Sequence, residues 1–331
     1  MKEILNLDFD IPIWRLFYDN SSYKIPYEFE YNNKEYKNGI TIIQFGWDPI
    51  VFISKLKNDL DRFINPILCV PDIEIKKILE KNFTCPVILA SHNAFINENI
   101  YNINNNIEKK YDLVINSCFE NYKRRHLANK IDNVIHIGYF QSDNGYIPSN
   151  GICPNFKNNI RSKDNYERLT NDECINYYNQ SKIGGIFSEV EGSCFSSGEY
   201  LLCGLPVLST KCSGGRQHWY NEKNSIICNP NENDIYNGYL LAFKKLKNGE
   251  FNPDEIRQMH LDEMDIHRNN LTLAVLEIMK KITNNIPKFN DLKESLKYYH
   301  SNIYSGNNIY TFEQKQNKEN LIAKEILDKY N

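Results

Sequence analysis

Two glutamates, Glu191 and Glu199, have the type and spacing to bind a sugar-like ligand. Seven mostly small residues separate them, and residues 188–210 predict a glycine turn, a short helix and a strand in one continuous unit. Both carboxylates can then face one cleft, and each can accept hydrogen bonds from hydroxyl groups at one end of the ligand. The alternative is an ordinary acidic residue at the helix start and a surface glutamate, because acidic side chains are common in first turns.

The turn between the two glutamates is a candidate anion site. The backbone N–H groups of residues 193–197 would lie at the N-terminus of the short helix, at the carboxyl edge of the sheet. A phosphate fits such a group of donors. The residues that this prediction places around the ligand are Gly192, Ser193, Cys194, Phe195 and Ser196.

A basic cluster follows the strand predicted at residues 111–116. Lys123 and Arg124 are its first two members, and residues 123–126 as a whole are expected to begin a helix. Positive charge at a helix N-terminus opposes the helix dipole unless an anion binds there, so the pattern indicates a phosphate site. A solvated basic face is the alternative. Gly214, Gly215 and Arg216 follow the strand predicted at residues 207–209 and can approach the same ligand.

His92 lies in a polar Ser-His-Asn sequence directly after the strand predicted at residues 86–90. Because ligands bind at the carboxyl ends of parallel strands, its imidazole is expected to face a cleft. A capping or structural histidine is an equally strong interpretation, since histidine titrates usefully only in special surroundings.

The elements that must position these residues alternate between strand and helix, which predicts parallel sheets covered by helices on both sides. Strands are expected at residues 4–9, 41–45, 66–70, 86–90, 111–116, 133–137, 182–188, 207–209 and 225–228. Amphipathic helices are expected at residues 171–181, 232–248, 253–282, 291–299 and 312–330. An asparagine-rich run at residues 102–106 is the candidate linker, so the predicted units are 1–106, 107–284 and a tail at 285–331.

Composition excludes several classes of protein. The 331 residues carry a formal net charge of −3, which gives no basic field for a nucleic acid. We find no leader pattern at residues 1–14 and no apolar run long enough to cross a bilayer, so the expectation is a soluble, cytoplasmic protein with at most peripheral membrane contact. Nine scattered cysteines without a paired motif, and no histidine at ligand spacing, predict reduced thiols and no metal site.

The order of these motifs resembles the donor-binding half of the retaining GT-B glycosyltransferases, and in particular the large family 4 group. The resemblance covers residues 111–230 and is most specific at residues 188–215, where a Glu-x7-Glu element precedes Cys-Gly-Leu-Pro-Val and a Gly-Gly loop. It implies two Rossmann-like domains facing a central cleft, with C-terminal helices that cross back to the first domain. The first domain is shorter than is usual in the family.

The resemblance also implies roles for individual residues. Glu191 would contact the transferred sugar, Glu199 would hold the ribose, and the turn amides with the Gly-Gly loop would approach the sugar and the diphosphate. The family's diphosphate-binding arginine has no counterpart, since Asn116 stands near its position. Lys123 or Arg124 would then bind the phosphate, and Arg216 is a replacement for the missing cation.

The implied reaction transfers a sugar from a nucleotide diphosphate-sugar to an acceptor hydroxyl with retention of configuration and without a metal or other cofactor. Lys123 would support the leaving phosphate and His92 would orient the sugar or the acceptor. The acceptor would be a carbohydrate or a lipid-linked molecule. Two alternatives remain open: a sugar-nucleotide 2-epimerase, and a non-catalytic protein that binds sugar nucleotides, which the missing arginine and the short first domain favour.

Overall fold

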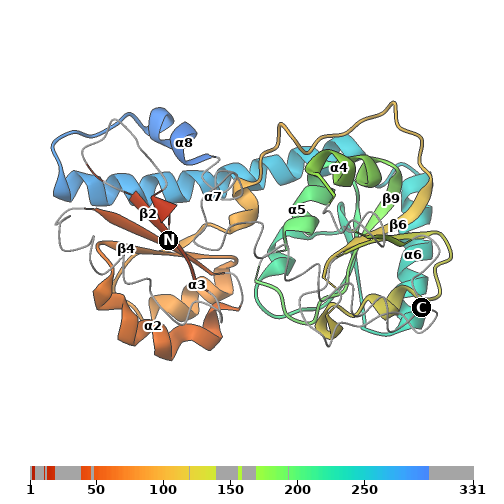
Figure 1. The fold of residues 1–331 in the computed structure, drawn as a ribbon, viewed down its shortest axis with the longest axis horizontal. Coiled ribbons are helices and arrows are strands. Elements are labelled where there is room, and N and C mark those ends of the chain that lie inside the picture. The colour runs from red at the N-terminus through yellow and green to blue at the C-terminus, as the bar shows by residue number, and fades with distance from the viewer. Residues whose placement is uncertain are drawn as a thin grey trace, which may run out of the picture.

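The computed structural model describes residues 2–3, 11, 13–18, 39–45, 48–118, 120–138, 156–158, 169–192 and 194–297. These residues form two α/β domains that lie side by side beneath one long shared helix (Figure 1). Each domain is built around its own sheet, and in both sheets the strands run almost entirely parallel. The predicted α/β class is confirmed.

The sheet of the first domain has the strand order β1-β2-β3-β4-β5. Only the edge strand β1 is antiparallel to its neighbour. The strands are β1 (Lys2–Glu3), β2 (Ile13–Tyr18), β3 (Ile40–Phe45), β4 (Pro66–Val70) and β5 (Val87–Leu89). The α-helices are α2 (Ile53–Asp59) and α3 (Ile73–Glu80). The short 3-10 helices, labelled η, are η1 (Pro49–Phe52), η2 (Leu60–Arg62) and η3 (His92–Phe95).

The sheet of the second domain is parallel throughout, with the order β11-β10-β9-β6-β7-β8. Its strands are β6 (Tyr111–Asn116), β7 (Val134–Gly138), β8 (Phe156–Asn158), β9 (Ser181–Ile186), β10 (Val207–Thr210) and β11 (Ser225–Cys228). The helices are η4 (Asn121–Lys123), η5 (Arg125–Ala128), α4 (Asn171–Asn179), α5 (Phe195–Leu202), η6 (Arg216–Trp219) and α6 (Glu232–Lys247).

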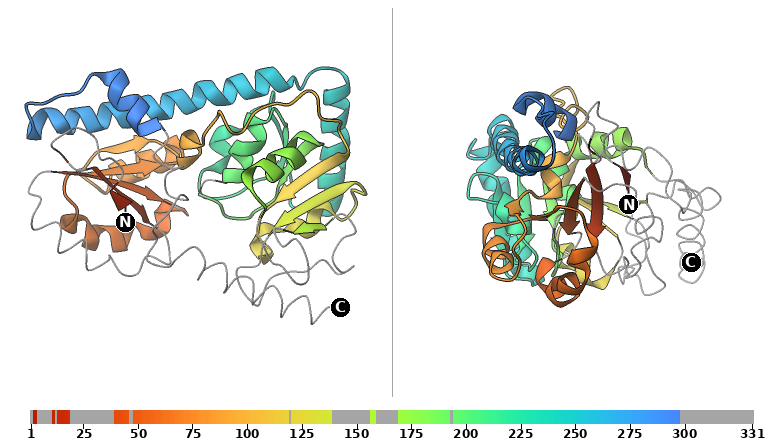
Figure 2. Two further views of the ribbon diagram at one scale, coloured as in Figure 1. Left: turned by 45° about the horizontal axis from the view of Figure 1, so that its top comes forward. Right: turned by 90° about the vertical axis from the view of Figure 1, so that its left-hand side faces the viewer.

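Helix α7 (Pro253–Ile282) joins the two domains (Figure 2). Asn252 caps its N-terminus, and Pro253 occupies the first turn, where a missing N–H group is harmless. The helix packs on α5 in the second domain and on β4, β5 and η3 in the first, and α8 (Phe289–Lys297) packs on α7. The chain therefore returns to the first domain within α7, ahead of the residues 285–331 to which the sequence analysis assigned that passage.

The apolar core is continuous between the domains. One buried cluster is confined to the first domain and lies between its sheet and α2 and α3, with Leu56 and Leu79 among its members. The other begins on the first sheet at Ile42, includes Leu271 on α7 and extends to Leu208 in the second sheet. Because burial of apolar surface is the main stabilising contribution, this continuous cluster holds the domains together.

Most of the expected elements form, and the exceptions are local. The capping box that Thr170 and Glu173 predict at the start of α4 is present. Strands β2 and β8 were not predicted, and the expected strand at residues 4–9 and helix at residues 312–330 lie outside the described residues. The helix expected from Lys123 onward is wrong, because Arg124 has left-handed backbone angles (φ 47°) and separates two short 3-10 turns.

The sequence also predicts that no segment crosses a membrane and that the cysteines are reduced. None of the helices in the described residues is both long and apolar enough to cross a membrane. The eight cysteines among those residues are free thiols, and four of them are buried. Burial raises the pKa of the Cys194 thiol to about 12, so this thiol stays protonated at neutral pH.

Candidate functional site

The turn that carries Glu191 is held against the glycine loop behind β10. Val190 pairs with Ser213 in an isolated parallel bridge, and the Glu191 amide donates to the Ser213 carbonyl at 2.9 Å. A Cβ atom on Gly214 would lie 2.5 Å from the Glu191 carbonyl oxygen, so only glycine fits there. The two loops at the carboxyl ends of β9 and β10 thus form one unit.

Lys123 and Glu191 form an ion pair in this unit. Lys123 Nζ lies 2.5 Å from Glu191 Oε2, and both side chains are about nine-tenths buried, at 10% and 11% exposure. Burial is the largest single influence and acts to lower the pKa of Lys123, but the attraction of Glu191 together with that of Cys194, Cys118 and Tyr122 outweighs it, and the pKa is raised. Lys123 is therefore a fixed positive charge beside the turn, and the residue assigned to the phosphate is in direct contact with the residue assigned to the transferred sugar.

Arg124 and Arg125 bind backbone oxygens. Arg124 Nε donates to the Phe187 carbonyl at 2.7 Å and one Nη2 contact reaches Thr210 Oγ1 at 3.0 Å. Arg125 is buried and donates to the carbonyl of Ile115 at 2.8 Å and to others at the ends of β6 and β7. Burial lowers its pKa to about 10, which leaves it charged at neutral pH. These arginines tie the strand ends together around Lys123.

Arg216 is fully buried, on η6 behind the glycine pair. Its guanidinium donates to Ser209 Oγ at 3.1 Å, to the Thr210 carbonyl at 2.9 Å and to the Ser188 carbonyl at 3.4 Å. Its Nε has no hydrogen-bond partner among the described residues. The cation therefore lies under the two loops, and its contacts in the structure are with backbone and hydroxyl oxygens.

Glu199 lies on α5, and its carboxylate faces tyrosines. The Tyr178 hydroxyl donates to Glu199 Oε2 at 2.6 Å and accepts from Asn116 Nδ2 at 2.5 Å. Burial raises the pKa of Glu199, and hydrogen bonds from Tyr178 and Tyr101 oppose that rise. Asn116, which stands near the position of the family's arginine, is thus linked through Tyr178 to the second glutamate.

The first domain contacts the start of α5 through η3. His92 is buried, and its ring centroid lies 4.4 Å from that of Phe195, the first residue of α5. Asn93 Nδ2 donates to the Cys194 carbonyl at 3.0 Å, and a Cβ atom on Gly198 would meet Ile96 at 2.7 Å. His92 is therefore buried at the domain junction, with its ring against the helix that bears Glu199, and the expectation that its imidazole faces a ligand cleft stays a prediction.

The glycine loop also contacts the first domain. Gly215 has φ +104°, and a Cβ atom there would lie 2.6 Å from Pro71 Cγ and 2.7 Å from Asp72 Oδ2. Pro71 and Asp72 connect β4 to α3. The loop after β10 is therefore in contact with the loop after β4, at the carboxyl ends of the two sheets.

Gly215→Ala is expected to destabilise the protein more than Gly249→Ala does. Gly249 also has a positive φ, +73°, but nothing lies within 4 Å of a Cβ atom there, so its replacement measures backbone strain alone, about 1–2 kcal/mol. Gly215→Ala adds the collision with Pro71. Urea unfolding of both variants measures the two free energies, and equal losses would contradict the close contact across the cleft.

A separate cavity of about 410 Å³ lies at the other edge of the second domain. Its lining includes Lys109, Lys182 and Phe243, and none of the predicted site residues. Lys182 is already paired with Asp112 at 2.7 Å. The cavity and the predicted site are therefore different places.

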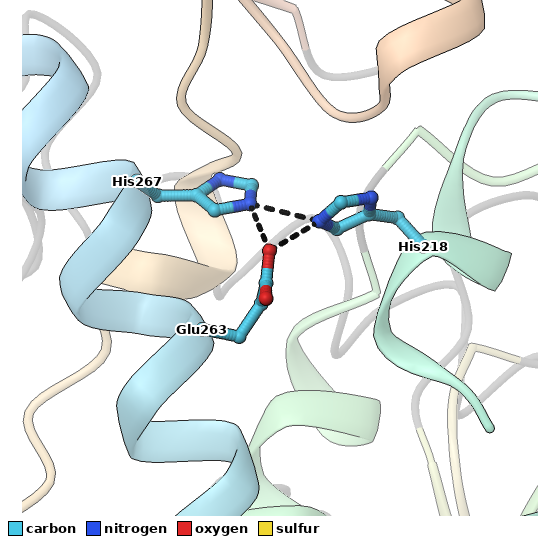
Figure 3. Close-up of side chains that lie close together, drawn as sticks. All are labelled: His218, Glu263 and His267. Atoms are coloured by element: carbon cyan, nitrogen blue, oxygen red, sulfur yellow. Dashed lines mark hydrogen bonds and ion pairs between the residues drawn. The ribbon is translucent and has the colours of Figure 1, made fainter.

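A cluster that the sequence analysis missed lies behind the glycine loop (Figure 3). His218 on η6 and Glu263 and His267 on α7 bring two Nε2 atoms and one carboxylate oxygen within 4.8 Å of one another. Glu263 and His267 are four residues apart on a predicted helix and so share a face. That spacing was a readable signal, but His218 comes from another element, and the meeting depends on the return of α7.

No protein-family model and no curated protein matches this sequence. Solved structures of similar fold include a glycosyltransferase from Rickettsia africae, with a TM-score of 0.53, 13% identity and coverage of 79% of this chain and 84% of that one. HepE from Anabaena, in complex with UDP and glucose, aligns with a TM-score of 0.52, 10% identity and coverage of 78% and 80%. Sucrose-phosphate synthase from Thermosynechococcus elongatus aligns with a TM-score of 0.50, 11% identity and coverage of 83% and 70%.

The chain covers 52% and 51% of two structures of TarM, so it spans about half the length of those proteins. At these identities the likeness concerns the fold. The fold is that of the GT-B architecture, with two Rossmann-like domains and a C-terminal helix that returns to the first. The fold that the sequence resemblance implied is therefore confirmed.

Proposed function

We propose that the protein binds a nucleotide diphosphate-sugar and transfers its sugar to an acceptor hydroxyl with retention of configuration. The observation that supports this most is the buried Lys123–Glu191 pair, held where the carboxyl ends of β6, β9 and β10 meet. A buried cation and a carboxylate side by side match the phosphate and the sugar of such a donor. HepE, whose fold is similar, was solved with UDP and glucose, which supports the same class of ligand.

In this proposal Lys123 exchanges its bond to Glu191 for one to the diphosphate. A charged hydrogen bond to phosphate contributes about 1.5–3 kcal/mol. The bond between the anomeric carbon and the phosphate oxygen breaks, a bond to the acceptor oxygen forms on the same face, and the acceptor proton passes to the departing phosphate. Lys123 neutralises the charge of the leaving group, and Glu191, released from Lys123, stabilises the cationic sugar in the transition state.

The other residues have positioning roles in this proposal. Gly192, residues 194–196 and the pair Gly214-Gly215 line the donor, and Arg124 and Arg216 fix the loops through their backbone contacts. Ser193, which the sequence also assigns to the donor site, lies outside the described residues. His92 packs on Phe195, so it orients the sugar or the acceptor only after that contact changes. We infer that no metal is required, because Lys123 supplies the positive charge at the phosphate.

Thermal-shift measurements against UDP-, GDP- and ADP-sugars test donor binding first. Release of free nucleoside diphosphate only when an acceptor is present then supports transfer, and release without acceptor supports the epimerase. Donor binding without turnover on any of a broad panel of carbohydrate and lipid-linked acceptors supports a non-catalytic binder. Asn116 favours the non-catalytic binder over the epimerase as the second candidate function, since it stands near the position of the family's arginine and is bonded to Tyr178.

Glu199→Ala is expected to abolish discrimination between ribonucleoside and 2′-deoxyribonucleoside diphosphates. One hydrogen bond from a ribose hydroxyl to a carboxylate accounts for about tenfold in affinity. Tyr178→Phe is the matched control, because it removes the 2.6 Å contact but keeps the carboxylate. Calorimetry with both diphosphates measures the ratio, and an unchanged ratio in Glu199→Ala would rule out the ribose role.

A further inference from the structure

Helix α7 is fixed to the first domain on both sides of η3. The Ser91 amide donates to His267 Nδ1 at 2.8 Å, immediately before His92. Arg268 Nε donates to the Ala94 carbonyl at 2.7 Å and Arg268 also pairs with Glu98 at 2.8 Å. His267 therefore holds the end of η3 that carries His92.

The second domain reaches the same point through His218. Its Nε2 lies 2.7 Å from Glu263 Oε1 and 3.0 Å from His267 Nε2 (Figure 3). His218 follows Gly215, which contacts Pro71, by three residues. A single chain of contacts thus runs from the first-domain amide of Ser91 through His267 and Glu263 to the loop that contains the glycine pair.

The Ser91 contact fixes the proton of His267. Because Nδ1 accepts a hydrogen bond from a backbone N–H, the neutral ring carries its proton on Nε2, which faces Glu263 Oε1 at 3.4 Å and His218. A histidine that binds a metal through Nε2 usually donates from Nδ1 to a carbonyl or carboxylate. The arrangement here is the reverse, so the three side chains form a hydrogen-bonded bridge and do not fit a metal site.

Protonation of His267 would break this bridge at Ser91. A protonated ring has N–H groups at both nitrogens, so Nδ1 would then present a donor to the Ser91 donor. The contact would become repulsive, and the attachment of η3 beside His92 would weaken.

We propose that His267 is a positioning residue whose neutral form holds the cleft closed, by linking Ser91 of the first domain to Glu263 and, through it, to His218 behind the glycine loop. Its effect on catalysis rests on the proposed function, because His92 and the Gly214-Gly215 loop are the parts it aligns. The closure itself does not depend on the identity of the substrate.

The groups around His267 set the sign of the pH dependence. Glu263 and His218 face its Nε2, the Trp219 ring lies 4.8 Å from it, and the first domain offers the uncharged Ser91 amide. Burial lowers the pKa of His267, and Glu263 opposes this without overcoming it. His260, two turns earlier on α7, has its pKa lowered to about 3 by burial and by His267 and Arg268, so it stays neutral.

The closed form therefore binds fewer protons at His267 than an open form in which the ring is solvated. Closure is fully favoured above the ordinary histidine pKa of about 6.5. Below it, closure weakens about tenfold per pH unit until the lowered pKa of the closed form is reached.

The variant His267→Gln tests the hydrogen bond to Ser91 separately from the positive charge that the imidazole can acquire. Glutamine offers a carbonyl oxygen to Ser91 and an amide to Glu263 but cannot be protonated. Wild-type protein is expected to show a larger radius of gyration in solution scattering at pH 5.5 than at pH 7.5. Over the same change from pH 7.5 to pH 5.5, the donor dissociation constant of the wild type is expected to rise about tenfold more than that of His267→Gln. Glu277→Gln, an exposed carboxylate on the same helix, should behave as wild type.

A second variant and a direct measurement guard against misfolding of His267→Gln. His218→Gln, on the partly exposed side of the bridge, is expected to flatten the scattering response in part. Nitrogen-15 NMR of the wild-type imidazoles at pH 7.5 is expected to show His267 as the Nε2–H tautomer.

Three results would overturn the proposal: an Nδ1–H tautomer at His267, a stoichiometric metal that Glu263→Gln removes, or the same pH response in His267→Gln and wild type. Failure of the proposed function has a different signature. In that case no sugar nucleotide binds any variant, while the scattering and NMR responses of the bridge remain measurable.

Discussion

Glu191→Gln is expected to lower the rate of sugar transfer about 10²–10³-fold while changing donor binding far less. The glutamine keeps the shape of the side chain and its place against the Ser213 carbonyl, which is set by the backbone. It removes the negative charge that stabilises the transition state, and only interactions stronger in the transition state than in the ground state affect the chemical step. Lys123 remains free to bind the diphosphate.

Transfer kinetics under saturating donor, with donor affinity from calorimetry, separate the two effects. Glu189→Gln is the matched control, because Glu189 is an exposed glutamate of the same turn, two residues away. It should retain activity within a factor of about two, as surface substitutions usually do. Wild-type rates in Glu191→Gln would exclude a catalytic role for Glu191 and leave the binding role alone.

The elements that the sequence predicts well are those whose signals are local. Strands β4, β6 and β11 coincide with the predicted residues, because each is a short apolar run bounded by turn residues. The Glu-x7-Glu unit is local too, and Glu191 and Gly214 meet because their strands are neighbours in the sheet. The Lys123–Glu191 pair was predicted only as two sides of one ligand site, and the direct contact needs the three-dimensional arrangement.

What could not be predicted depends on backbone choices or on contacts between distant segments. The left-handed conformation of Arg124 replaces a helix that the basic cluster suggested, and the Arg124 side chain bonds to Phe187 and Thr210, far along the chain. The tyrosine partner of Glu199 lies on α4, 21 residues earlier. The His218–Glu263–His267 bridge exists only because α7 returns across both domains, and no local sequence pattern predicts the course of this helix.

The same return of α7 brings residues of both domains together behind the glycine loop. Residues on one face of this helix contact η3 at Ser91 and Ala94, and another residue, Glu263, contacts His218 of the second domain. Helix α7 therefore carries contacts to both domains along its length.

Lys123→Ala is expected to lower the free energy of unfolding by about 3–5 kcal/mol, because it leaves the carboxylate of Glu191 buried without its charged partner. Glu191→Ala should have a similar effect, because it leaves the ammonium group of Lys123 buried without its charged partner. The double variant removes both charges, so its loss is expected to be smaller than the sum of the two single losses. The difference is the coupling energy of the pair in the absence of donor.

The control is the exposed pair Lys77–Glu74 on α3, whose side chains are 58% and 73% exposed. Its cycle should give a coupling of about 0–1 kcal/mol, since solvent screens surface ion pairs. Urea unfolding at neutral pH measures all six variants. Additive losses at Lys123 and Glu191 would show that the two charges do not interact in solution. Exchange of the Glu191 carboxylate for phosphate at Lys123 would then lose its physical basis, because that step requires the pair to form before the donor arrives.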